Sequence, residues 1–150
     1  MVERITNGDV QLKELQTGLV IRAHMTGSRY IGGAKEDSDY DVLVHVEGGA
    51  LYEYADTLRA AGWDVSVDDP EYMGEDNHEW EFITARSEQD GQVWNLICYD
   101  DPGCAYSWWR ATEFAKRMNL TSKSDRGELF SIVMGMRATH GKNLDPAAGG

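Results

Sequence analysis

The sequence has little of several residue types, and each shortage excludes a class of protein. Only two of its 150 residues, Cys98 and Cys104, are cysteine, which excludes a disulfide-rich secreted domain and a zinc finger with paired Cys and His ligands. No apolar run approaches the roughly 18 residues of a membrane span, and the first residues, MVERITNGD, do not resemble a signal peptide. We therefore expect a cytoplasmic protein with no membrane segment.

Positive charge is also scarce, and it is unevenly distributed. The chain has 14 Lys and Arg against 26 Asp and Glu, for a net charge of −12. Residues 1–109 carry a net −15, whereas residues 110–142 carry a net +4. A long polynucleotide would mostly be repelled. The basic segment could still hold a small phosphate ligand or the end of an RNA, or its cations could simply be solvated on helix faces.

The remaining composition fits one folded domain. With 41% hydrophobic residues, a chain of this length can bury a sizeable core. We expect a single domain over residues 1–142 and a disordered tail over residues 143–150.

Hydrophobic periodicity and turn residues predict the order of the elements. Helices are expected over residues 9–18, 50–61 and 106–118 and from about Ser124 onward, and strands over residues 19–25, 38–46, 63–67, 80–87 and 93–99. The last two strands should form a hairpin around Asp90-Gly91, and the acidic segment 68–79 should be a loop. Helices packed on one face of a mixed sheet would give an α+β fold.

The apolar spacing also predicts which side of each helix is buried. In the helix over residues 50–61 the inward residues are Leu51, Tyr54, Ala55 and Leu58. In the helix over residues 106–118 they are Trp108, Ala111, Ala115 and Met118, and in the last helix Leu129, Ile132, Val133 and Met136.

Candidate functional residues gather between Met25 and Val46. Gly27-Ser28 offers backbone N–H groups and a hydroxyl to a phosphate, and Asp39 and Asp41 follow at the head of an apolar strand. Strand side chains alternate between faces, so both carboxylates project to one side. They repel each other without a cation. Mg²⁺ fits, because it is usually held by one or two carboxylates together with substrate phosphates.

The pattern of Gly-Ser, ten intervening residues and Asp-x-Asp resembles the DNA polymerase beta-like nucleotidyltransferase superfamily, in particular its minimal and short phage-encoded members. The resemblance is clearest over Leu19–Val46 and looser over Trp63–Met136. It implies a mixed sheet like the polymerase beta palm. A polar turn before a capped strand is the alternative interpretation of the same residues.

The resemblance implies metal-dependent transfer of a nucleoside monophosphate from a nucleoside triphosphate to a hydroxyl. Two Mg²⁺ or Mn²⁺ ions about 3.5–4 Å apart would be bridged by Asp39 and Asp41. Gly27 and Ser28 would hold the β- and γ-phosphates, and Arg29 could also contact the triphosphate. An RNA end or a protein hydroxyl could be the acceptor, in the host cytoplasm if the protein is phage-encoded.

From the charge asymmetry we predict that four basic residues face the same cleft: Arg110, Arg117, Lys123 and Arg126.

The sequence departs from the superfamily at a third position. The family has a further carboxylate on a later strand, and Asn95 occupies the matching place in Val93–Ile97. An amide is uncharged and cannot act as a base. Glu79 or Glu81 could substitute for it, or Asn95 could be an ordinary buried amide. Two functions therefore stay open: an active nucleotidyltransferase, or a catalytically weak or inactive relative that binds nucleotides and acts as a regulator.

Overall fold

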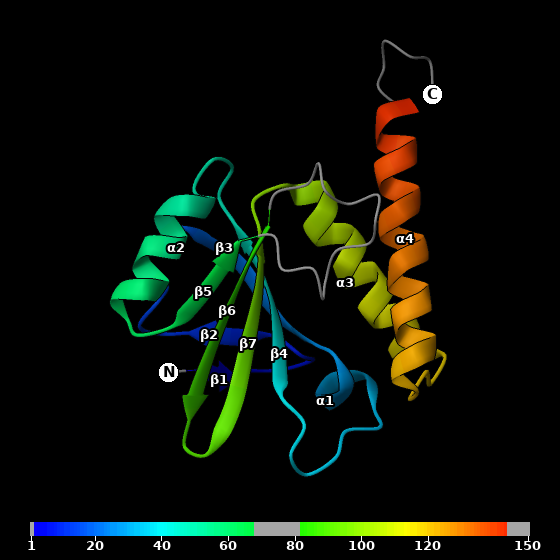
Figure 1. Ribbon diagram of the computed structural model, residues 1–150, viewed down its shortest axis with the longest axis horizontal. Helices are drawn as coiled ribbons and strands as arrows, with labels where there is room; N and C mark the ends of the chain where they lie inside the picture. Colours follow the sequence, from blue (N-terminus) through cyan, green and yellow to red (C-terminus); the bar gives the residue numbers. More distant parts are fainter. Residues whose placement is uncertain (1, 68–81, 144–150) are drawn as a thin grey trace.

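The computed structural model describes residues 2–67 and 82–143 (Figure 1). Its helices are α1 (Ser28–Ile31), α2 (Leu51–Ala60), α3 (Pro102–Arg117) and α4 (Lys123–Asn143). Its strands are β1 (Val2–Arg4), β2 (Val10–Leu12), β3 (Val20–Thr26), β4 (Tyr40–Val46), β5 (Asp64–Val67), β6 (Phe82–Gln89) and β7 (Gln92–Tyr99). The predicted acidic loop over residues 68–79 lies outside the described residues.

Five strands form one mixed sheet in the order β3-β4-β7-β6-β5. The central pair β4 and β7 is parallel, and the other neighbours are antiparallel. The predicted hairpin joins β6 to β7, with positive φ angles at Asp90 and Gly91 as a tight turn requires. Together with the four helices, this sheet confirms the α+β class.

The helices cover both faces of the sheet, not one face as the sequence suggested (Figure 1). Val42 and Val44 of β4 belong to a core with α2 on one side, whereas Leu43 belongs to a second core with α3 and α4 on the other. A strand that is apolar on both sides must be covered on both sides, because exposing either face to water would lose hydrophobic stabilisation.

The predicted helix over residues 9–18 is wrong. Residues Val10–Leu12 form β2, which pairs with β1 in a separate two-stranded sheet. Val10 and Leu12 are both buried, and a spacing of two residues puts them on one side of a strand. The third apolar residue of this segment, Leu15, follows the strand and is also buried, so three apolar residues at short spacing did not distinguish the two structures.

The helix over residues 50–61 is confirmed as α2 with its predicted buried side, but the two C-terminal helices need corrections. The first, α3, begins earlier than predicted, at Pro102, after Asp101 caps its N-terminus, and Met118 at its end is 54% exposed. Among the described side chains of α4, Met134 is buried, the predicted Leu129 and Val133 are partly buried, and Ile132 is 58% exposed. Phe130 and Met134, four residues apart, form the side that packs on α3, so the predicted face was rotated.

The predicted buried residue Met136 lies beyond the described side chains, while the backbone of α4 continues to Asn143, the first residue of the predicted tail.

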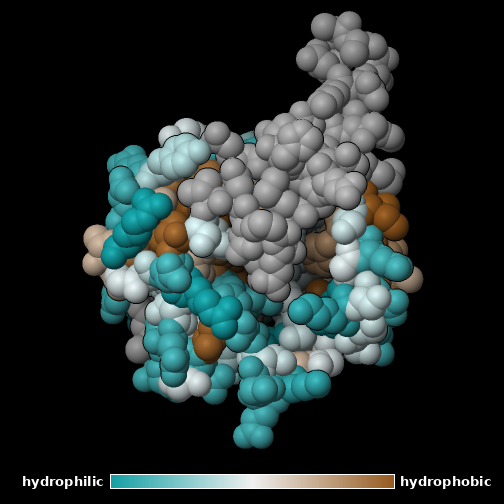
Figure 2. Space-filling model, viewed as in Figure 1, coloured by the Kyte–Doolittle hydropathy of each residue, from teal (hydrophilic) through white to brown (hydrophobic). Residues whose placement is uncertain are grey.

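Hydrophilic side chains cover most of the described surface seen in Figure 2. In the described parts of the chain, none of the helices combines the length and apolarity that a membrane span requires.

Candidate active site

A cleft of about 800 Å³ opens on the side of the sheet that carries α3 and α4. Strands β3 to β7 form its floor, and α1, the loop over residues 33–39 and the first turns of α4 form its walls. Gly27, Ser28, Asp39, Asp41 and Asn95 all line it. The structure therefore brings together the candidate residues of the carboxylate strand, the Gly-Ser turn and the later strand.

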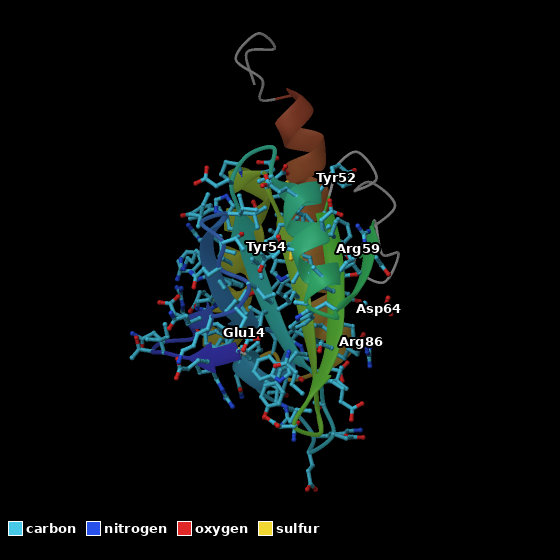
Figure 3. All side chains as sticks on the ribbon, turned by 90° about the vertical axis from the view of Figure 1, so that its left-hand side faces the viewer. Glu14, Tyr52, Tyr54, Arg59, Asp64 and Arg86 are labelled. Carbon is cyan, nitrogen blue, oxygen red and sulfur yellow. The ribbon has the colours of Figure 1, made fainter. Side chains whose placement is uncertain are left out.

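A row of polar side chains crosses the floor of the cleft. In the strand register Asp64 pairs with Arg86, Arg86 with Asn95, Asn95 with Asp41, and Asp41 with Thr26. Directly paired residues project from the same face of a sheet, so the row comes from all five strands. Figure 3 shows Asp64 and Arg86 on neighbouring strands.

Arg86 and Asp64 were missed by sequence reasoning. Within β6, Phe82 belongs to the core below α3, so alternation places Thr84 and Arg86 on that same face. This local signal was available, but it does not say which residue of the partner strand lies opposite. The pairing of Arg86 with Asn95 had to come from the tertiary structure.

Asn95 joins the two aspartates. Its Nδ2 donates to Asp39 Oδ2 at 3.0 Å and to Asp41 Oδ1 at 3.1 Å. The predicted alternation is confirmed, since Leu96 is buried in the core on the opposite face and Trp94 packs against that core. Asn95, at the position that the family resemblance assigned to a third carboxylate, is therefore an amide between two acidic side chains.

These residues fit a divalent cation. An ionised carboxylate only accepts hydrogen bonds, so Asp39 and Asp41 direct one oxygen each at a single electropositive NH₂ group. A hard cation that prefers oxygen ligands can take the place of that group. Among the residues that the structure describes, however, no group of three or more His, Cys, Asp or Glu side chains is arranged to hold a metal. Asp39 and Asp41 offer two carboxylates, which is the number that Mg²⁺ usually takes from a protein when substrate phosphates complete its coordination.

Gly27 allows the turn before α1 to approach Asp41 closely. It has φ 69° and ψ −167°, a conformation that is essentially restricted to glycine. A Cβ at this position would collide with the carboxylate of Asp41. Ser28 follows at the first residue of α1 and lines the same cleft as Asp41.

Arg29 does not line the cleft. Its guanidinium donates to the carbonyl oxygens of Glu36 at 2.7 Å and Ser38 at 2.9 Å, and it lies 4.5 Å from the ring centroid of Tyr40. These hydrogen bonds hold the loop that leads into Asp39, and the phosphate contact of Arg29 stays a prediction. Tyr40 in turn stacks on Trp94 at 4.5 Å, which ties this loop to β7.

The basic C-terminal residues divide into two pairs. Lys123 and Arg126 line the cleft, as predicted. Arg126 also donates to the carbonyl oxygen of Thr121 at 2.7 Å, which fixes the turn before α4. Arg110 and Arg117 are not part of the cleft lining: Arg110 instead contacts Tyr106 one turn earlier on the exposed side of α3. The prediction was wrong for this pair, because both side chains are exposed on α3, whereas the buried side of this helix packs on the sheet and on α4.

A buried hydrogen-bond chain fixes α3 against the end of β3. Trp108 Nε1 donates to Thr26 Oγ1 at 3.2 Å, Thr26 and Thr112 hydroxyls lie 2.7 Å apart, and Thr112 donates to the carbonyl oxygen of Trp108. Since Thr112 donates to that carbonyl, Thr26 is the donor between the hydroxyls. Thr26 immediately precedes Gly27, so this chain sets the position of the Gly-Ser turn.

Comparisons with known proteins agree with this geometry. A family model described as a nucleotidyltransferase domain matches residues 10–100, more than half of the chain. The match includes Gly27, Ser28, Asp39, Asp41 and Asn95. A search of curated proteins found no match. The chain therefore belongs to the nucleotidyltransferase domain family.

Proposed function

We propose that the protein is a divalent-metal-dependent nucleotidyltransferase that moves a nucleoside monophosphate from a nucleoside triphosphate to a hydroxyl group. The family gives the general reaction, nucleotidyl transfer. The observation that carries the rest is the convergence of Asp39 and Asp41 on one point in a cleft that also holds Ser28. Its volume of about 800 Å³ is within the range of small-molecule sites.

Each residue has a role in this proposal. Asp39 and Asp41 hold Mg²⁺ or Mn²⁺, which supplies charge stabilisation at the phosphates when bound. Ser28 and the backbone at Gly27 contact the β- and γ-phosphates, and Lys123 offers them a positive charge from the start of α4. The acceptor oxygen forms a bond to the α-phosphorus, the bond to the bridging oxygen breaks, pyrophosphate leaves, and the acceptor hydroxyl loses its proton.

Asn95 favours a second candidate, a catalytically weak or inactive relative that binds nucleotides and acts as a regulator. A neutral amide cannot take the proton of the acceptor hydroxyl. Glu79 and Glu81, the predicted substitutes, lie outside the described residues. Under this second function the cleft binds triphosphate without turnover, a role that short phage-encoded members could use in a host cytoplasm.

Labelled nucleoside triphosphates with Mg²⁺ or Mn²⁺ separate the two functions. The active enzyme transfers label to an RNA end or a protein hydroxyl and releases pyrophosphate, and Asp41→Asn abolishes both. The weak relative shows a metal-dependent rise in Tm with triphosphate but no product. Asp56→Asn is a matched control, because Asp56 is a 79% exposed carboxylate on α2, across the sheet from the cleft. Metal-dependent binding that survives loss of both Asp39 and Asp41 would overturn the assignment.

Glu81→Gln tests one of the two carboxylates that could take the proton of the acceptor hydroxyl. If Glu81 takes the acceptor's proton, this variant keeps triphosphate binding and loses transfer. If transfer is unchanged, the proton leaves by another route and Glu81 is not the base. Cys98 and Cys104 are both buried and form no disulfide. The reducing cytoplasm expected for this chain belongs to the same proposal.

A further inference from the structure

We propose that this cleft binds one divalent cation per triphosphate rather than a pair. We propose also that the guanidinium of Arg86 provides positive charge where a second cation would otherwise do so. The inference rests on the proposed function, because it concerns how the same cleft neutralises the triphosphate. It is carried by three residues of the polar row and by Asp39, which lies beside them.

Among the described residues, Asp39 and Asp41 are the carboxylates that meet at Asn95, and two carboxylates are enough for one cation. Asp39 and Asp41 provide the carboxylate oxygens that a single Mg²⁺ needs alongside phosphate oxygens and waters. A second cation would need another anionic ligand beside these two. The residue next to Asp41 across the parallel pair is Asn95, which is neutral, and the part of the chain that the structure describes has no cluster of three acidic or other metal-binding side chains.

Arg86 is next in the row after Asn95. Its Nη2 lies 3.6 Å from Asp39 Oδ2, the same oxygen that Asn95 contacts. An amide in place of a third carboxylate removes one negative charge, and a guanidinium beside it adds one positive charge. The two changes together equal the charge of one divalent cation. With Arg86 present, a pair of cations would therefore be crowded by a third positive group, whereas one cation would not.

Arg86 can leave Asp39 at low cost. Its side chain is 60% exposed, and ion pairs with that exposure contribute little to stability. A cation that takes Asp39 Oδ2 competes with both Asn95 and Arg86 for this oxygen. The guanidinium is then available to phosphate oxygens, which its planar fork of N–H groups binds in bidentate fashion. Asp64 lies opposite Arg86 in the register of β5 and β6 and also lines the cleft.

Counting bound Mn²⁺ tests the stoichiometry directly. The protein is saturated with a non-hydrolysable nucleoside triphosphate analogue, Mn²⁺ is added, and bound Mn²⁺ is counted by electron paramagnetic resonance. We expect one Mn²⁺ per chain for the wild type. In the Asn95→Asp/Arg86→Gln double variant, a carboxylate replaces the amide and the competing guanidinium is absent, so we expect two.

The affinity for the analogue tests Arg86 itself. Arg86→Gln should weaken it by roughly tenfold, the effect of losing a charged hydrogen bond, and Arg86→Lys should restore part of the loss. Arg59→Gln is the matched control, because Arg59 is 51% exposed and pairs with Asp56 at 3.2 Å on α2, away from the cleft (Figure 3). It should leave the affinity unchanged.

The outcomes separate this inference from the proposed function. Two Mn²⁺ ions in the wild type, or an Arg86→Gln affinity equal to that of Arg59→Gln, would overturn the inference and leave the proposed function standing. The double variant holding a single ion would also contradict it. Mn²⁺-independent or absent analogue binding in the wild type would reject the proposed function itself. Thermal unfolding shows whether each variant is folded. If the double variant does not fold, the affinity of Arg86→Gln for the analogue tests the inference by itself.

Discussion

Replacing Gly27 with alanine tests the close approach between the Gly-Ser turn and Asp41. The new Cβ must adopt φ 69° and ψ −167° and collides with the Asp41 carboxylate. Alanine in such a conformation costs about 1–3 kcal/mol. In a domain of this size each kcal/mol lowers Tm by about 2–4 °C. The carboxylate must also move, so binding of Mn²⁺ with triphosphate should weaken by at least about tenfold, as misplaced metal ligands typically cause.

Gly18 provides the control for backbone strain. It has φ 84°, and a Cβ there would meet nothing within 4 Å. Gly18→Ala should therefore lose about 1–2 kcal/mol of stability for its left-handed backbone and bind ligand like the wild type. Urea unfolding measures the free energies of unfolding of both variants, and calorimetry with Mn²⁺ and a triphosphate analogue measures their affinities.

The reasoning depends on a difference between these variants. If Gly27→Ala binds Mn²⁺ and the analogue as tightly as Gly18→Ala does, the placement of Asp41 does not depend on the missing Cβ. If both variants lose affinity equally, the effect comes from general destabilisation and not from the collision. Either result would refute the argument that Gly27 is needed to bring the two parts of the site together.

Three further predictions concern single side chains. Ser28→Ala should weaken triphosphate binding by about 1–2 kcal/mol in calorimetry, and a covalent adduct on Ser28 would contradict its role as a phosphate contact. Thr26→Val removes the acceptor of the Trp108 Nε1 hydrogen bond and should cost about 1–3 kcal/mol in urea unfolding; an unchanged midpoint would show that the chain through Thr112 is unimportant. Burial lowers the pKa of His45 below its ordinary 6.5, so its stabilising contribution is present above that pH and is lost as the pH falls through the folded-state pKa. His45→Gln should therefore lose less stability than the wild type between about pH 7.5 and pH 5.5, and equal losses would contradict this.

The N-terminal segment and the last helix show where sequence patterns were ambiguous. Val10, Leu12 and Leu15 fit a short helix as well as a strand, and pairing with β1 decided for the strand. In α4 several apolar residues lie on different sides, and contact with α3 selected Met134 as a buried residue and Phe130 as a partly buried one. In both cases the contact with another element settled the structure, and local periodicity carries no information about that contact.

The sequence by itself determined what depends on near neighbours along the chain. Strand alternation placed Asp39 and Asp41 on one face, and alternation in β7 placed Asn95 on the face opposite Leu96. The amphipathic spacing of α2 and the Asp90-Gly91 turn are local in the same sense.

Only the tertiary structure decided which distant residues meet. It put Arg86 beside Asp39, turned Arg29 toward the backbone of its own loop, and brought Lys123 of α4 to the cleft while leaving Arg110 outside it. The physical reason is that strand register and helix docking are set by packing over the whole core. A side chain's neighbours across strands therefore follow from the sum of many contacts, not from its own sequence context.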